Sequence, residues 1–403
     1  MVATTAVNQR SAKVIGLVGA GHFFSHFYWL VLPPLFPLLR VEFDVSYAAL
    51  GFLISAMAVA SGVVQLPIGF AVDRVGPVAI LAGGLALLAG AILLIGLAPS
   101  YWMVLALMVF AGIGNAVFHP ADYSILANTV PHHRLGRAFG LHTFSGHLGW
   151  AVAPALMGAF AVSIGWRAGL VVVGAAGLVV ALVILANKAL LHGDDAAPDA
   201  ARPALRAEPG ARRGIRLLMT LPILTCFLFF VLLSTALSGL GAFLVAALID
   251  LHGITLGAAN MALTAFYVGS AAGILVGGVI ADRTRRHGLV AAIGFSIAAA
   301  LIVIVGEAAL PVAGLIALIS TTGFASGLVA PSRDLIVRAA TPEGQTGKVF
   351  AFVSVGLDVG AVITPPVFGW IIDSGEARWL FWLVAAVLLL AVATVAGTRR
   401  SRG

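Results

Sequence analysis

The chain has 403 residues, of which 61% are hydrophobic and only 10% are charged. Soluble domains carry about 25% charged residues, so these few charged side chains could not cover a water-soluble globule of this size. Composition therefore excludes a soluble enzyme or binding module, and the single cysteine, Cys226, excludes a disulfide scaffold and a thiolate metal site. The formal net charge of +7 would suit a nucleic-acid partner, but the mean hydropathy of +1.08 indicates a membrane protein.

Twelve apolar segments are long enough to cross the hydrocarbon core as helices, which takes about 20 residues each. They span residues 14–39, 46–71, 77–98, 102–127, 136–163, 167–187, 217–249, 255–281, 288–309, 311–337, 347–372 and 378–397. The first is too long, and its flank at Arg40, Glu42 and Asp44 too polar, for a cleaved signal peptide.

Basic residues are concentrated in alternate loops. If the N-terminus lies in the cytoplasm, nineteen of the twenty-three Lys and Arg residues fall in cytoplasmic segments. Three fall outside (Arg40, Arg167 and Arg378), and Arg333 lies within a span. Cytoplasmic loops carry such an excess of Lys and Arg. The pattern predicts a multi-pass protein of the cell (inner) membrane with both termini in the cytoplasm.

Residues 188–216 are rich in Ala, Pro, Arg and acidic residues and show no apolar period. We interpret this stretch as a flexible cytoplasmic linker whose charges are solvated or face lipid. It predicts an N-terminal six-helix bundle over 1–187 and a C-terminal six-helix bundle over 217–403.

The two halves repeat the same glycines and prolines at nearly one offset. Gly69–Arg74 matches Gly278–Arg283 at an offset of 209, and Pro120 falls on Pro331 at an offset of 211. Further matches at 211 are Gly149 with Gly360, Pro154 with Pro365 and Gly158 with Gly369. Two homologous bundles about a pseudo-two-fold axis are typical of transporters that work by rocking.

The stretch Gly69-Phe-Ala-Val-Asp73-Arg74 resembles the loop between helices 2 and 3 of the major facilitator superfamily, Gly-x-x-x-Asp-Arg/Lys-x-Gly-Arg. Gly76 fits this pattern, whereas Pro77 departs from it, so the loop's second basic residue is missing. The resemblance extends over the whole chain. It implies an all-α integral membrane fold with twelve transmembrane helices in two pseudo-symmetric six-helix bundles.

The aspartate of this loop lies at a helix end, where helix-terminal amides and a basic side chain can hold it. We expect a conformational latch on the cytoplasmic side, with a plain surface turn as the alternative. Its residues are Gly69, Asp73 and Arg74, the partner Arg137, and the repeat copies Asp282 and Arg283.

Helix 5 carries a second signature. Gly140, Gly149, Ala153-Pro154 and Gly158 resemble the glycine-proline motif of the family's antiporters, although Ala153 and Met157 stand where that motif has glycine. The match favours export, and helix packing without directional meaning is the alternative. Gly21-His22 and Val117-Phe118-His119-Pro120 are similar to the fosmidomycin-resistance branch of the superfamily, whose members export drugs.

Polar side chains inside the spans are few. A charge at the bilayer centre costs on the order of 2.5–3.5 kcal/mol, so each should face a cavity or a partner. They are His22, His26, Gln65, Asn115, His119, Asp122, His142, His147, Asn260, Arg333, Asp334 and Asp358.

His22 and His26 lie four residues apart and share one helix face. In the resembling family helix 1 lines the cavity, so we expect both, with Asn115, to bind substrate or to move protons. Packing is the alternative. His-x-x-x-His is also half of a metal site, but the set of such boxes that membrane di-iron enzymes need is not in the sequence, and we expect no metal and no cofactor.

Asp122 and Arg333 occupy repeat-equivalent positions on helices 4 and 10 and carry opposite charges. We expect them to face each other across the lumen as a switchable ion pair that also meets substrate or proton, with a permanent structural bridge as the alternative. His119 lies three residues before Asp122, on the same face, so the protonation of these two groups is expected to be coupled.

Asp358 lies mid-span in helix 11 and is repeat-equivalent to His147. It is a second candidate for proton coupling, with a hydrogen-bonded structural acid as the alternative. Asp334 is expected to form an ordinary helical pair with Arg338, four residues on.

An arginine, several histidines and few acids predict an anionic or amphiphilic small-molecule substrate. The sequence contains no Walker-type motif, so we expect a gradient of protons to supply the energy. We therefore expect a transporter rather than an enzyme: a monomer, with no nucleic-acid partner, in the lipid bilayer. It would work by alternating access, as proton-coupled efflux (antiport) of a drug or small polar or anionic metabolite. Proton-coupled uptake (symport) of a small organic anion is the alternative.

Overall fold

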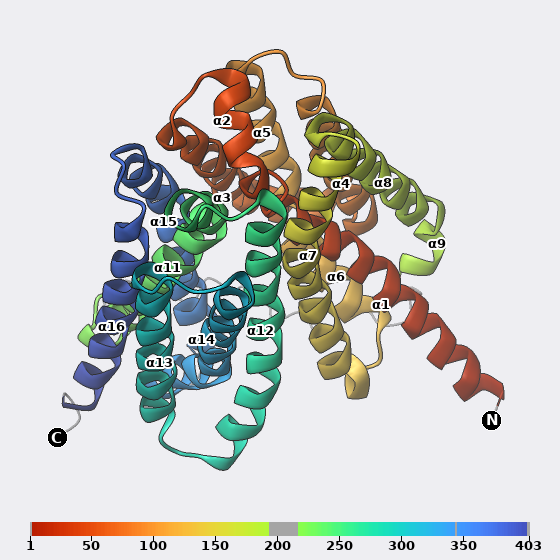
Figure 1. Ribbon diagram of the computed structural model, residues 1–403. Coiled ribbons are helices and arrows are strands. Elements are labelled where there is room, and N and C mark those ends of the chain that lie inside the picture. The colour runs from red at the N-terminus through yellow and green to blue at the C-terminus, as the bar shows by residue number, and fades with distance from the viewer. Residues whose placement is uncertain (1, 193–216, 343–344, 401–403) are drawn as a thin grey trace. The chain divides into compact units, whose positions relative to one another are not determined.

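A computed structural model describes residues 2–192, 217–342 and 345–400, and every regular element in these ranges is a helix (Figure 1). The chain divides into two compact units. The first is Met1–Val45 with Phe52–Pro198, and the second is Ser46–Gly51 with Asp199–Gly403. Most of the expected linker, 193–216, lies outside the described residues, so the predicted domain boundaries stay a prediction.

The first half of the chain begins with a long helix and ends with a short one. Its elements are α1 (Val2–Trp29), η1 (Pro33–Leu35), α2 (Phe36–Phe43), α3 (Tyr47–Val75), α4 (Pro77–Ile95), α5 (Tyr101–Asn115), α6 (Phe118–Thr129), η2 (His132–Arg134), α7 (Leu135–Ser163), α8 (Trp166–Ala186) and α9 (Lys188–Leu191). The four-residue α9 lies where the sequence predicts the start of the flexible linker.

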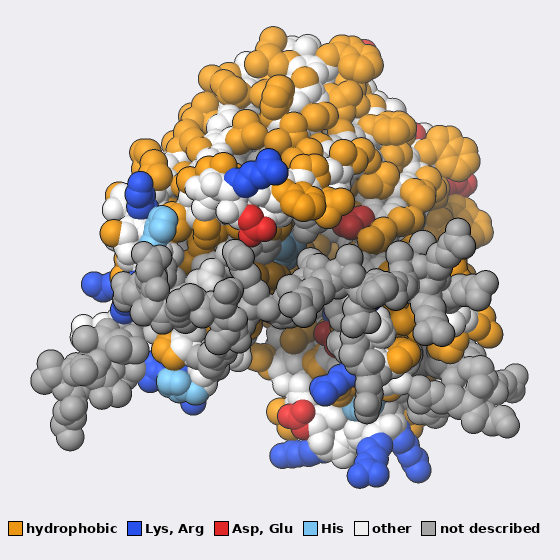
Figure 2. Space-filling model, turned by 180° about the vertical axis from the view of Figure 1, so that it is seen from behind, with side chains coloured by type: hydrophobic (Ala, Val, Ile, Leu, Met, Phe, Trp, Pro, Cys, Tyr) orange, Lys and Arg blue, Asp and Glu red, His pale blue; other side chains and the backbone are white. Residues whose placement is uncertain are grey.

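The described part of the second half consists of six long helices. They are α11 (Leu221–His252), α12 (Leu256–Arg283), α13 (His287–Glu307), α14 (Val312–Ala340), α15 (Thr346–Asp373) and α16 (Arg378–Arg400). Among the described residues, eleven helical stretches are long and apolar enough to cross a membrane, and the apolar part of α16, Arg378–Thr394, is shorter. Hydrophobic side chains cover the upper part of the face that Figure 2 shows, and Lys, Arg and His side chains gather toward its lower end. The predicted all-helical membrane fold is thus confirmed.

The fourth predicted span is broken in its middle. Its two parts, α5 and α6, are separated by Ala116 and Val117, and Pro120 stands in the first turn of α6. Proline has no N–H to donate to the carbonyl four residues earlier, and its ring crowds that carbonyl. The repeat-equivalent Pro331 lies inside the continuous helix α14. The two halves therefore differ in backbone conformation at this position.

Helix pairing is repeated between the halves. In the first unit α1 packs against α7 and α4 against α8, and in the second α11 packs against α15 and α13 against α16. The matched glycines explain part of this. A Cβ on Gly149 of α7 would overlap the Phe23 carbonyl of α1, and a Cβ on Gly360 of α15 would lie 2.6 Å from the Ser234 Cβ of α11. Each glycine lets the same pair of backbones approach.

Arg167, in the first turn of α8, ties together one end of the first unit. Its Nη1 donates hydrogen bonds to the carbonyl oxygens of Ala98 at 2.7 Å and Gly96 at 3.4 Å, in the loop between α4 and α5. Its Nη2 donates to Glu42 Oε1 of α2 at 2.9 Å. The guanidinium carbon also lies 4.4 Å from the centre of the Trp166 ring.

Arg167→Gln should lower the thermal stability of the purified protein far more than Glu42→Gln. The arginine provides charge-assisted hydrogen bonds to loop carbonyls, worth about 1.5–3 kcal/mol, whereas the Arg167–Glu42 ion pair, 36% and 43% exposed, is worth about 0–1 kcal/mol. Melting curves of the two variants in one detergent measure the difference. Equal losses would show that the ion pair, and not the loop carbonyls, is the main partner.

Candidate functional site

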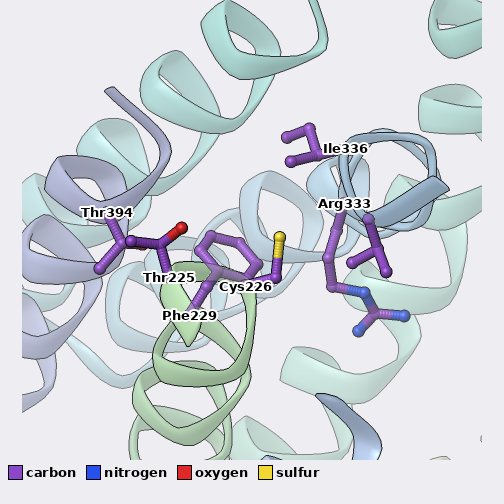
Figure 3. Close-up of a pocket in the computed structure, with 7 residues that line it drawn as sticks. Thr225, Cys226, Phe229, Arg333, Ile336 and Thr394 are labelled. Carbon is purple, nitrogen blue, oxygen red and sulfur yellow. The ribbon is translucent and has the colours of Figure 1, made fainter. Parts of the chain in front are cut away.

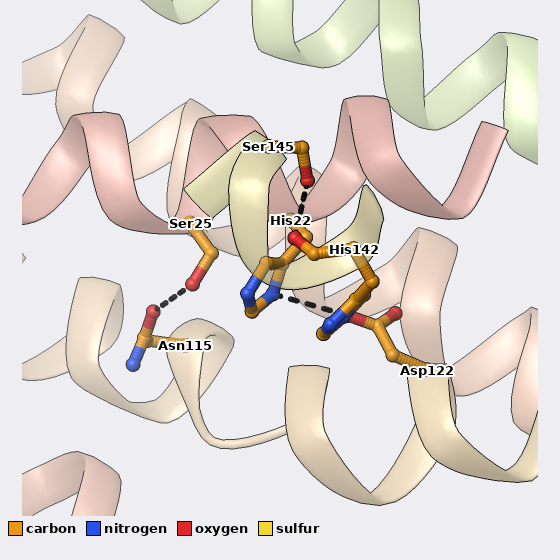
Figure 4. Close-up of polar contacts among 6 residues, drawn as sticks. All are labelled: His22, Ser25, Asn115, Asp122, His142 and Ser145. Carbon is orange, nitrogen blue, oxygen red and sulfur yellow. Dashed lines mark hydrogen bonds and ion pairs between the residues drawn. The ribbon is translucent and has the colours of Figure 1, made fainter. Parts of the chain in front are cut away.

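Asp122 of α6 lies at the centre of a polar cluster inside the first unit. Its side chain is fully buried, and its Oδ2 accepts a hydrogen bond from His142 Nε2 of α7 at 2.9 Å when that nitrogen is protonated. His22 Nδ1 of α1 lies 3.3 Å from the same oxygen. Figure 4 shows both imidazoles converging on the carboxylate. Burial of an unpaired carboxylate is costly, so the histidines are the groups that compensate its charge.

The rings around Asp122 form a continuous array. His22 stacks on His142 with ring centres 3.6 Å apart, and its ring centre lies 4.4 Å from that of His26 and 5.8 Å from that of His119. Four predicted site residues, His22, His26, His119 and Asp122, therefore lie together within one unit.

His142 is a partner of Asp122 that the prediction of site residues missed. Helices α6 and α7 are joined by a tight turn around His132, and Asp122 and His142 lie ten residues before and after that turn. Residues equidistant from the turn of a helical hairpin lie at equal depth. This spacing was the available signal.

Asn115, the last residue of α5, is held by hydrogen bonds at both ends of its amide. Its Oδ1 accepts from Ser25 Oγ of α1 at 2.8 Å, and its Nδ2 donates to Ser61 Oγ of α3 at 3.1 Å. The amide therefore joins three helices directly before the break between α5 and α6 (Figure 4 shows the Ser25 bond). These hydrogen bonds show that Asn115 holds three helices together. Its role in substrate binding stays a prediction.

The cluster is open on one side. His22, Asp122 and His142 are buried, whereas His119 and Tyr123 are exposed. The His119 ring stacks on Tyr123 at 5.9 Å. Polar side chains that are exposed within a membrane span face a water-filled cavity in preference to lipid. His119, whose ring centre lies 5.8 Å from that of His22, is thus the exposed member of the cluster.

Glycine in α7 makes room for the α1 histidines. A Cβ on Gly146 would lie 2.9 Å from His22 Nε2 and 3.0 Å from His26 Cδ2. Gly140 has no atom within 4 Å of such a Cβ. In the helix 5 signature, Gly149 therefore has a packing explanation that Gly140 lacks.

Arg333 is placed differently from its repeat partner Asp122. Its Nε donates to Asp334 Oδ1 at 2.8 Å, and its guanidinium carbon lies 5.0 Å from the centre of the Phe230 ring of α11. Asp334 therefore pairs with Arg333, and the expected helical pair with Arg338 is wrong. The described partners of Asp122 and of Arg333 each lie within their own unit, and the pairing of these two residues with each other stays a prediction.

Arg333 lines a small, partly open hollow between α11, α14 and α16. Its other walls include Thr225, Cys226, Phe229 and Thr394. Figure 3 shows the guanidinium on the side of the stem that faces away from Thr225 and Thr394. The charged end of Arg333 therefore lies outside this largely apolar hollow.

Two further acidic sites lie on accessible surfaces. Asp358, mid-span in α15, is exposed. The predicted latch residues Asp73, Arg74, Arg137, Asp282 and Arg283 are exposed at helix ends. Among the described ion pairs of these helices, none joins Asp73 to Arg137.

Gly76, at φ +95°, makes the turn into α4, and Pro77 is the first helical residue, a position that proline favours.

The donor atoms of His22, Asp122 and His142 lie within 4.8 Å of one another. Two histidines and one carboxylate at this spacing have the donor set of a transition-metal triad as well as that of a proton site. A strong chelator would remove a metal ion from such a triad and would leave a proton site unaffected.

Two bundles of membrane-spanning helices with repeated pairing and buried ionisable groups define a membrane transporter. The Major Facilitator Superfamily model matches residues 18–248 and 226–402, and the chain belongs to this family. It is therefore not an enzyme, and the resemblance noted in the sequence is confirmed.

Relatives include the fosmidomycin resistance protein of Escherichia coli (strain K12), 23% identical over 285 residues, which are 70% of this chain and 68% of that protein. A phosphoglycerate transporter protein of Salmonella typhimurium is 29% identical over 37% of this chain and 33% of its own. A crystal structure of a bacterial homologue of the human lysosomal transporter Spinster, inward-facing and unoccupied, superimposes with a TM-score of 0.83 at 18% identity, covering 97% of both chains.

Gly146→Ala should disrupt the histidine array, while Gly140→Ala on the same helix should not. A methyl group at 146 must displace His22 or His26, and overpacking typically costs about 1–3 kcal/mol. Melting temperature and transport are the measurements. If both variants behave like the unmodified protein, α1 and α7 are not as closely packed as described.

Proposed function

We propose that the protein is a secondary active transporter that works by alternating access and couples the efflux of a drug or small anionic metabolite to proton entry. The observation that carries the proton coupling is Asp122, a fully buried carboxylate in contact with two histidines. Imidazole titrates near neutral pH, so such a cluster can take up and release a proton while its net charge stays small. His119 provides the route from the accessible face, and Asp358 is the second proton-coupling candidate.

The choice of an anionic substrate is supported by Arg333, the cationic side chain that lies within a span. Histidines His22, His26 and His119 add positive charge when protonated, and Asn115 adds hydrogen-bonding groups. The names of the fosmidomycin and phosphoglycerate relatives also suit a substrate with an acidic group.

Efflux is favoured by the helix 5 signature and by the relative named for drug resistance. Proton-coupled uptake of a small organic anion is the second candidate, and the phosphoglycerate transporter among the relatives favours it. For either direction we propose that the protein acts as a monomer in the cell (inner) membrane, with both termini in the cytoplasm.

Asp122→Asn should abolish transport driven by an imposed pH gradient. The amide keeps the shape of the side chain but cannot exchange a proton, so substrate binding should survive while proton-driven flux falls to the level of empty vesicles. The measurement is flux of radiolabelled fosmidomycin, and of a panel of organic anions and amphiphilic drugs, in right-side-out and inverted vesicles. Undiminished proton-driven flux would remove Asp122 from the mechanism.

The matched control is Asn128→Asp on the same helix, which adds an acid near the helix end and should leave the pH dependence unchanged. A chelator arm uses the same vesicles. Transport that survives prolonged treatment with a strong zinc chelator is expected for a proton site, whereas loss of flux restored by Zn²⁺ would identify the triad as a metal centre.

Charge neutralisation of the proposed latch should alter the rate of transport without altering substrate affinity. Asp73→Asn and Arg137→Gln remove the opposite charges that would hold the cytoplasmic side in one state. We expect a several-fold lower maximal flux with an unchanged half-saturating concentration. A double variant no slower than either single variant supports one shared contact, and additive losses contradict it.

A further inference from the structure

Two contacts fix the orientation of the Arg333 guanidinium. One edge of its guanidinium, at Nε, is occupied by Asp334 Oδ1 at 2.8 Å. One face of the guanidinium lies on the Phe230 ring, 5.0 Å from the ring centre. The side chain is 22% exposed, so it is neither sealed in the core nor free in solvent.

Neither contact uses the two terminal nitrogens, Nη1 and Nη2, and we call this pair of N–H-bearing atoms the Arg333 fork. Parallel N–H groups of this kind bind two oxygens of one carboxylate, phosphonate or sulfonate group. Because an aromatic ring and an intrahelical neighbour restrict the side chain, little further rotamer freedom is lost when an anion binds.

The surroundings of the fork also specify the rest of the ligand. Phe227, one turn from Phe230 on α11, stacks on Phe352 of α15 with ring centres 5.0 Å apart. Gly356 of α15 brings the two backbones together there, since a Cβ on it would lie 3.1 Å from the Phe230 Cβ. The Phe230 ring lies against the guanidinium and the Phe227–Phe352 pair lies one turn away along α11, so an apolar or aromatic group next to the acid would lie near aromatic side chains.

We infer that Arg333, with Asp334 and Phe230 as positioning residues, is the subsite in the second unit that binds the oxyanion group of an amphiphilic substrate. This inference rests on the proposed transport function and makes it more specific. The polar cluster around Asp122 would serve the proton, and the Arg333 fork would bind the oxyanion group of the substrate, in different units. A dissolved substrate and a lipid headgroup share this oxyanion chemistry, and the experiment distinguishes them.

The test measures binding of phenylphosphonate and benzoate to the purified full chain by calorimetry, with neutral benzamide as the shape control. The unmodified protein should bind the two anions saturably and benzamide at least tenfold more weakly. Arg333→Lys keeps the charge but loses the fork, and Arg333→Gln loses both. Each should weaken phenylphosphonate binding about 10- to 100-fold, since charge-assisted hydrogen bonds are lost. Arg338→Gln, near the end of the same helix, is the matched control and should bind normally.

Asp334→Asn separates positioning from contact. The amide oxygen can still accept from Arg333 Nε, while the charge that repels an anion is gone, so phenylphosphonate should bind at least as tightly as before. Weaker binding would overturn this assignment, because the amide oxygen would then not hold Arg333 in place as the carboxylate does. So would anion binding that is absent from the unmodified protein or unaffected in both Arg333 variants. Melting curves must show that the variants fold, and a variant that does not fold is replaced by Phe230→Leu, for which we expect several-fold weaker binding.

The source of the anion is decided in lipid nanodiscs. If a dissolved substrate uses the fork, phosphatidylglycerol and phosphatidylcholine discs should give the same affinity for phenylphosphonate. Competition by phosphatidylglycerol that Arg333→Gln removes would assign the fork to a lipid headgroup and overturn the substrate role. Failure of the transport proposal gives a different result. If anion binding depends on Arg333 but no proton-driven flux is found, the transport proposal fails and the Arg333 subsite is still supported. Proton-driven flux that ignores Arg333 leaves the transporter standing without it.

Discussion

The charge of Asp122 is the constraint around which the first unit is organised. A carboxylate with no exposed surface inside a membrane helix must be compensated locally, and the chain does so with imidazoles from α1 and α7. That requirement fixes how closely the two helices approach, and Gly146 and Gly149 are the residues that permit the approach. The polar cluster and the packing of the bundle are therefore one feature and not two.

The duplication of the chain makes the contrast between its halves informative. Asp122 and Arg333 occupy the same position of the repeat, yet their surroundings differ. Asp122 is fully buried and contacts two histidines, whereas Arg333 is partly exposed and contacts Asp334 and the Phe230 ring. Because each charge is compensated within its own unit, neither needs the other to be stable in the membrane. A pairing between them would be a property of one transport state and not a condition of folding.

Sequence reasoning predicted the architecture well because hydropathy, charge placement and the repeat all act at the level of whole helices. The apolar segments and the 211-residue offset of Gly149 and Gly360 follow from such signals, whereas the grouping of His22 and His26 with Asp122 was seen only in the structure. It was less successful where side-chain geometry decides. The choice of Asp334 between Arg333 and Arg338 depends on rotamers, and the recognition of His142 depends on the exact turn between α6 and α7, which helical periodicity alone does not fix.

The irregular turn between α5 and α6 depends both on the sequence, through Pro120, and on side-chain contacts on either side of it. On one side of it, Asn115 is hydrogen-bonded to Ser25 and Ser61, and on the other, Asp122 is held by histidines. The two helical segments are thus fastened by independent sets of contacts, and Pro120 removes the backbone hydrogen bond that would have joined them rigidly. If Asp122 exchanges a proton as proposed, its changed contacts would act on α6 while the serines hold α5. In a transporter that uses this proton, the hinge would already lie beside the group that titrates, and His119 at the start of α6 would move with it.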